Sequence, residues 1–148
     1  MLATFEKELI ATIKDLKENT APYLGEFENK DEMSLLIKGG DSFVFVEFVG
    51  ENYKDMIKKI ATYNIHILST TQSKNKEARL ENRLNAIILC ERIDSRLRNS
   101  LLDNEFAIKL NELKVSFNSI SDYGYAYVLT RVVQTEFIEK SEFLMEEE

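Results

Sequence analysis

The sequence contains one proline, one cysteine, one histidine and no tryptophan among its 148 residues. A single cysteine cannot form a disulfide within the chain, and one histidine with one cysteine falls short of the three or four ligands that an ordinary zinc site uses. The short glycine-rich run 38–42 lacks the GK[ST] ending of a phosphate loop, so we interpret it as a hairpin-type turn. We therefore expect no metal and no cofactor.

The residues that most often carry catalysis are also scarce. His66 falls in the middle of a predicted strand between apolar neighbours, which favours a structural histidine over a catalytic one. Cys90 falls on the apolar side of a predicted helix, where a buried and inert thiol is expected. The carboxylates are numerous but scattered, and no pair is spaced as an acid–base couple. We expect that the chain is not an enzyme.

Long apolar runs are absent as well. The N-terminal residues are interrupted by charges and resemble neither a signal peptide nor a membrane span, so a soluble protein made inside the cell is expected. The net charge of −7 argues against specific binding of nucleic acid, which needs clustered Lys and Arg. The same charge argues against binding to an anionic membrane surface.

What the sequence does contain is a series of periodic segments separated by polar turns. Apolar residues recur every three or four positions in the helices and every second position in the strands. Residues 19–32 read as a polar connection and 33–38 as either strand or helix. The predicted elements are helix 2–18, strand 43–49, strand 57–70, helix 77–102, strand 112–120 and strand 124–138.

This order predicts an α+β fold in a single domain covering residues 1–138. Two hairpins joined by a long helix should combine into one antiparallel or mixed sheet of at least four strands, because an isolated hairpin is marginal in water. The long helix should pack across this sheet, and the N-terminal helix should pack beside it. Residues 139–148 (EKSEFLMEEE) form an acidic C-terminal tail with a small apolar cluster.

The last predicted strand, 124–138, is unusually long and apolar on both faces. Fifteen extended residues reach about 50 Å, whereas a compact domain of this length is about 40 Å across. Its predicted hairpin partner, 112–120, is shorter, so residues near 133–138 should lack a hairpin partner. We therefore expect Val133, Thr135 and Phe137 to contact another subunit. The alternative is a central strand that is covered by a helix on each face.

Five of the six arginines fall on the long predicted helix. Arg92 and Arg96 are four residues apart and share one side of it. These arginines belong either to a solvated outer surface or to a basic strip that contacts an acidic surface on a neighbouring subunit, a role that suits the planar guanidinium group.

The element order and several local phrases resemble a known family over residues 5–138. The phrases are LATFEKELIATIK, VFVEFVG, KKIATYNIHILS, NRLNAIILCERIDSRLRNSLL, LKVSFNSIS and YAYVLTRVVQTEFI. They resemble the small tail proteins of Mu-like contractile-tailed phages and phage-derived tail particles, which are grouped with tail terminators. The resemblance implies an α+β subunit that forms a hexameric ring at the head-proximal end of the tail tube. It carries over no individual functional residue.

Together these observations predict a structural, non-enzymatic ring subunit that stops polymerisation of the tail tube. Its expected partners are copies of itself, the tube and sheath proteins, and the neck or connector proteins. It would reside in the host cytoplasm during assembly and then in the virion or tail-like particle. The alternative is a small acidic adaptor or inhibitory protein that acts as a monomer on a basic partner.

Overall fold

The computed structural model describes residues 2–98, 101–102 and 106–138, and the predicted acidic tail lies outside these residues. Helices and strands alternate along the chain. In order they are α1 (Leu2–Lys14), β1 (Thr20–Pro22), the 3₁₀ turn η1 (Glu26–Glu28), α2 (Lys30–Gly39), β2 (Ser42–Tyr53), β3 (Lys58–Thr71), α3 (Lys76–Arg98), β4 (Leu101–Leu102), β5 (Phe106–Ser121) and β6 (Gly124–Ile138).

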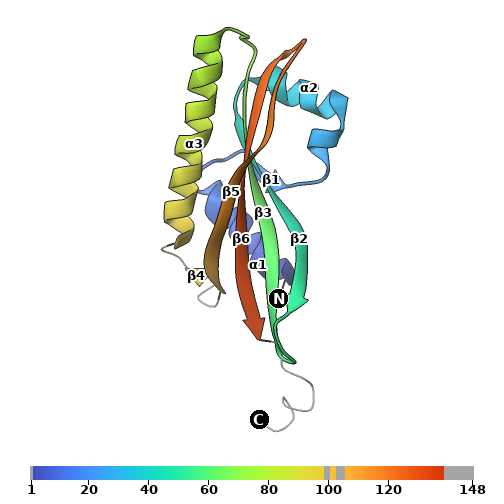
Figure 1. Ribbon diagram of the computed structural model, residues 1–148, viewed down its shortest axis with the longest axis vertical. Helices are drawn as coiled ribbons and strands as arrows, with labels where there is room; N and C mark the ends of the chain where they lie inside the picture. Colours follow the sequence, from blue (N-terminus) through green and yellow to red (C-terminus); the bar gives the residue numbers. More distant parts are fainter. Residues whose placement is uncertain (1, 99–100, 103–105, 139–148) are drawn as a thin grey trace.

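The architecture is α+β, as the sequence predicted. A five-strand mixed sheet has the order β1-β2-β3-β6-β5, and the two residues of β4 pair with the start of β5. The strand β1 runs parallel to β2, and all other neighbours are antiparallel. The long strands run the length of an elongated molecule, with α3 alongside them (Figure 1).

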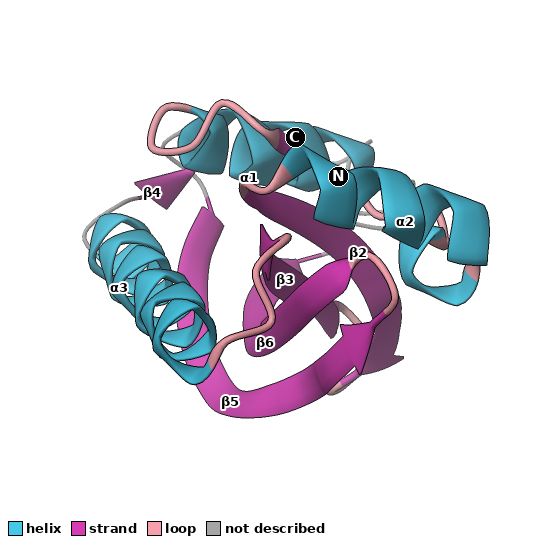
Figure 2. Ribbon diagram, turned by 90° about the horizontal axis from the view of Figure 1, so that it is seen from above, coloured by secondary structure: helices cyan, strands magenta, loops and turns pink. Residues whose placement is uncertain are grey.

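The main core lies between one face of the sheet and the helices α1 and α3. Phe5, Leu9 and Ile13 recur on one side of α1 and are fully buried, as the helical spacing requires. Residues of α3 such as Ile93 join the same cluster, together with alternate residues of β3 and β6. Seen along the strands, the sheet curves beneath α1 and α2, with α3 at its flank (Figure 2).

A second, smaller core lies on the opposite face of the sheet under α2 and η1. Met33 and Ile37 of α2 pack against Phe45, Leu68 and Val128. This cover reaches the part of the sheet near the β5–β6 turn, where α2 lies (Figure 1). The other end of this face carries the partly exposed side chains of β3 and β6.

The helix α2 settles the ambiguous segment 33–38. Asn29 caps its start by accepting hydrogen bonds from the backbone N–H groups of Asp31 and Glu32. Gly40 ends the helix with a left-handed φ of 61°, which glycine adopts without steric cost. The glycine-rich run is therefore a helix C-terminal cap, and the prediction of a hairpin-type turn there was wrong.

The strand β5 differs most from its prediction. It begins at Phe106 instead of residue 112, and it pairs with β6 as far as Ile108 opposite Thr135. Two register shifts, between Leu110 and Leu113 and between Val115 and Phe117, break the alternation that marks a strand in the sequence. The helices also end earlier than predicted, α1 at residue 14 and α3 at residue 98.

Candidate functional site

The far end of β6 is buried inside the chain's own fold. Val133, Thr135 and Phe137 expose 0%, 3% and 2% of their surface. The ring of Phe137 contacts the ring of Phe5 edge-on, with 5.9 Å between centroids. The strand β3 pairs with β6 as far as Ile138, and the pairing of β5 with β6 reaches Thr135. The inference that the end of β6 lacks a hairpin partner was therefore wrong for Val133 and Thr135.

The two arginines predicted at an interface lie on α3, away from the buried end of β6. Arg96 Nη2 lies 3.5 Å from the Asp15 carboxylate just after α1, so it links the two helices at the surface. Arg92 is exposed one turn earlier and forms no salt bridge with a described residue. The five residues predicted for the interface thus do not form one surface.

The sixth arginine holds three elements together. Arg131 of β6 donates from Nε and Nη2 to the Asp94 carboxylate of α3, at 3.0 and 2.7 Å, and from Nη1 to the carbonyl oxygen of Asn111 in β5. These hydrogen bonds raise the pKa of the guanidinium group. The sequence feature that could have indicated these hydrogen bonds is a single arginine among the apolar residues of a predicted strand.

The single histidine is buried at the centre of a polar chain. The two ring nitrogens of His66 lie 2.8 Å from Thr130 Oγ1 and 2.7 Å from Glu47 Oε1, and Ser116 Oγ lies 2.5 Å from the same Thr130 hydroxyl. The ring also contacts the rings of Tyr23 and Phe27. Both ring nitrogens lie within hydrogen-bonding distance of a side chain, which agrees with the prediction of a structural histidine. No sequence pattern indicated these partners.

Cys90 is buried on α3, as predicted. Burial, together with the nearby Asp94 carboxylate, raises the pKa of its thiol to about 11. The thiol is therefore protonated near neutral pH and is a poor nucleophile.

The outer edge of β2 is open over much of its length. The strand β1 pairs only with Val44–Val46, and just beyond it Tyr23 N–H donates to the Val46 carbonyl oxygen at 2.8 Å. From Glu47 to Tyr53, β2 pairs with β3 on its inner side and with no described strand on its outer side. Val49 in this stretch is 54% exposed. We call residues 47–53 the β2 edge.

The outer edge of β5 is open as well. The strand β4 pairs with Phe106 and Ala107, and from residue 108 to 121 no described strand lies on the outer side of β5. Val115 at the middle of this stretch is 55% exposed, and the neighbouring Leu113 and Phe117 are also exposed. We call residues 108–121 the β5 edge. Long apolar edge strands are normally covered in native proteins, because they pair readily with other chains.

Three apolar residues also lie on the exposed side of α3. Leu80, Leu84 and Ile88 follow one another at four-residue spacing and are all exposed. From spacing alone, Leu80 and Leu84 were expected to widen the buried side that carries Ala86 and Cys90. The structure buries Asn82 and Leu89 there instead.

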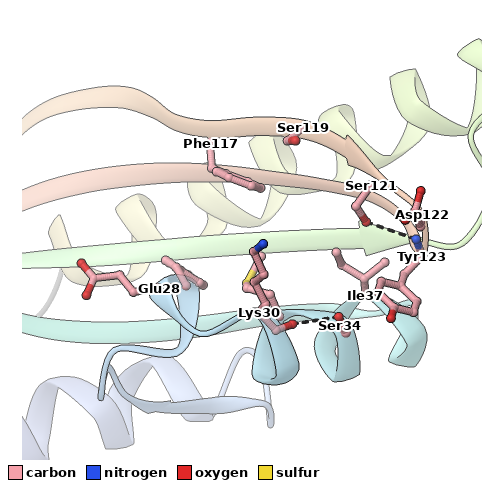
Figure 3. A pocket seen from close by; sticks show the side chains of 11 residues that line it. Glu28, Lys30, Ser34, Ile37, Phe117, Ser119, Ser121, Asp122 and Tyr123 are labelled. Atoms are coloured by element: carbon pink, nitrogen blue, oxygen red, sulfur yellow. Dashed lines mark hydrogen bonds between the residues drawn. The ribbon is translucent and has the colours of Figure 1, made fainter.

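Two pockets lie near the β5–β6 turn. The first, of about 340 Å³, lies between α2 and the end of β5 and is drawn in Figure 3. Its floor includes Met33 and Phe117, but Lys30, Glu28 and Asp122 give it charges of both signs. The second, of about 270 Å³, lies at the start of α3; it is lined by Lys76, Arg79, Leu80, Arg83, Asn118 and Tyr125.

The described residues form no cluster of three or more His, Cys, Asp or Glu side chains that could hold a metal ion. Among the helices of that part of the chain, none is both long and apolar enough to cross a membrane. In comparisons with known proteins, no family model matches the chain, and no curated protein matches it.

Proposed function

We propose that the chain is a structural, ring-forming subunit that assembles head to tail through the β2 edge of one copy and the β5 edge of the next. The observation that carries this proposal is that both edges of a single sheet are open and carry exposed apolar side chains. A protein that buried its edges within one chain would have no need of a partner there.

The strand directions favour this arrangement. Each step from β2 through β3 and β6 to β5 is antiparallel, so β2 and β5 run in opposite directions. Rotation about a ring axis to which the strands are tilted keeps the strand directions, so copies meet with β5 antiparallel to the neighbour's β2. Antiparallel pairing is the more stable kind per residue.

Ring closure follows from the use of two different edges. A two-fold dimer that pairs β5 with β5 would leave both copies of the β2 edge open. Head-to-tail pairing covers both edges in every copy, and it ends without free edges when the rotation closes into a ring.

The site of action of this ring is proposed from the sequence resemblance. We infer a tail terminator at the head-proximal end of a contractile tail, where the ring stops tube polymerisation and contacts tube, sheath and neck proteins. The role is structural and non-enzymatic, in the host cytoplasm during assembly and then in the particle. The buried His66 and Cys90, neither of which is free to act on a substrate, are consistent with it.

The proposal is tested by light scattering and native mass spectrometry of the purified protein, alone and with tail tube protein, followed by electron microscopy of the tubes. We expect rings and tubes of limited length. Val49→Lys and Val115→Lys, one on each edge, should each abolish ring formation, whereas Leu35→Lys on the exposed side of α2 should not.

A strict monomer at high concentration that neither binds tube protein nor limits tube length would refute the proposal. If such a monomer instead bound a basic protein in a way that depended on its carboxylates, the adaptor function would replace the terminator function.

A further inference from the structure

We propose that the basic pocket at the start of α3 is a carboxylate-binding site, and that its ligand is the acidic tail of a neighbouring copy, residues 139–148. This inference rests on the proposed function, because it requires that copies assemble. It gives a role to the cationic side chains of this pocket and to the acidic tail, neither of which takes part in the proposed pairing of the strand edges.

The pocket gathers positive charge. Lys76, Arg79 and Arg83 line it, and none of the described residues that line it is acidic. On α3, Glu77 and Glu81 fall on the opposite side, because successive residues are 100° apart around the helix axis. Charge-assisted hydrogen bonds from arginine to carboxylate are among the strongest that proteins form.

One donor in the pocket lacks a partner. Arg79 Nε is buried and has no hydrogen-bond partner among the described residues. Its guanidinium carbon lies 6.0 Å from the centroid of the Tyr125 ring, and the Tyr125 hydroxyl donates to Asn118 Oδ1 at 2.5 Å. The ring and this hydrogen bond hold one wall of the pocket in place, while the donor stays unsatisfied. A buried donor without an acceptor is destabilising, and a carboxylate held by the same guanidinium group would compensate for it.

The tail has the matching chemistry. Five of its ten residues are glutamates and one is a lysine, and Phe143, Leu144 and Met145 stand between Glu142 and the final glutamates. Leu80, which lines the basic pocket and is exposed, offers apolar surface to such a cluster.

A chain cannot place its own tail in its own pocket. Tyr125 lies at the start of β6 and Ile138 at its end, and thirteen residue steps of about 3.3 Å separate them by about 43 Å. From Ile138 to Glu148 an extended chain reaches at most about 35 Å, because each residue spans about 3.5 Å. The start of α3 and the end of β6 lie at opposite ends of the molecule (Figure 1).

A neighbour in the proposed ring is better placed. Within one chain, Glu51 of the β2 edge lies at the same height in the sheet as Ile108 of β5. Glu51 pairs with Ala61, Ala61 with Thr135, and Thr135 with Ile108. Because of the register shift between Leu110 and Leu113, Val115 lies level with Leu129, six residues from Thr135. If Glu51 of the neighbour pairs near Val115, the centre of the open β5 edge, the neighbour therefore shifts by about 20 Å along the strands. The remaining distance along the strands, about 23 Å, is within reach of its tail. Such a stagger is the ordinary consequence of strand tilt in a closed sheet.

Cross-linking between full-length proteins tests the inference. One protein carries Leu80→Cys in the pocket, a second carries Met145→Cys in the tail, and a third carries Leu35→Cys on α2 as the control. The native Cys90 is buried and stays unmodified. With a short bis-maleimide, the tail cysteine should link to the pocket cysteine at least about fivefold more than to the control. A chain carrying both Leu80→Cys and Met145→Cys should link between chains and not within one.

Charge reversal gives the matched control. Arg83→Glu should reduce the cross-link at least about threefold, while Arg92→Glu, the same change on the same helix, should leave it unchanged. Changing Glu146, Glu147 and Glu148 to Lys in the partner should restore linking to the Arg83→Glu pocket. Equal yields at pocket and control sites, or a link within one chain, would overturn the inference. If light scattering of those samples still shows rings, the proposed function stands without it; if it shows monomers, both fail.

Discussion

Replacing Phe137 by Ala separates a core role from an interface role at the end of β6. The ring is 2% exposed and packs against Phe5, so its removal leaves a cavity in the main core. Truncation of a buried Phe to Ala costs about 3–5 kcal/mol. A domain of this size has about 5–15 kcal/mol of stability, and its melting temperature should fall by roughly 8–16 °C.

The assay is urea unfolding followed by circular dichroism, at a protein concentration where light scattering shows monomers. The control is Ile138→Ala on the adjacent residue, whose side chain is 56% exposed and should change stability by less than about 1 kcal/mol. If Phe137→Ala left the monomer as stable as the wild type while abolishing assembly, Phe137 would be an interface residue and the core assignment would be wrong.

Three further tests probe the fold. Two use variants in the same unfolding assay, and the third uses a thiol reagent on Cys90. Gly124→Ala should lower the free energy of unfolding by about 3 kcal/mol or more, because φ is +142° and an added Cβ would clash with the backbone oxygen of Thr71 in β3. Gly25→Ala, with φ +89° and open space around it, should cost about 1 kcal/mol, and equal costs would contradict the packing. Asp94→Asn should cost about 2–3 kcal/mol by weakening the hydrogen bonds of Arg131, and a cost under about 0.5 kcal/mol would show that this brace is dispensable. Because burial raises the pKa of Cys90 to about 11, its thiol should react with a disulfide reagent at pH 8 at least tenfold more slowly than in urea, and equal rates would refute its burial.

Strong periodicity made most of the fold predictable. The segments around α1, β3, α3 and β6 alternate or repeat clearly, and the α+β class with a long helix on a sheet followed from their order. The helix α2 was ambiguous because its apolar residues fit both periods. The capping Asn29 and the terminal Gly40 were signals that could have decided it.

The candidate site was less predictable, because it depends on how strands pair. The register shifts in β5 hid its first residues, and that error made the end of β6 look unpartnered. The open edges became visible once β1 and β4 were seen to cover only short parts of β2 and β5. Likewise, no sequence pattern indicated that Arg79 and Arg83 would face Tyr125 across a pocket.

The most direct test of edge pairing is amide hydrogen exchange on the protein at two concentrations, one monomeric and one assembled. We predict that assembly slows exchange by at least about tenfold in the β2 edge, residues 47–53, and in the β5 edge, residues 108–121, with little change in α1. Assembled rings whose two edges exchange as fast as in the monomer would contradict the account.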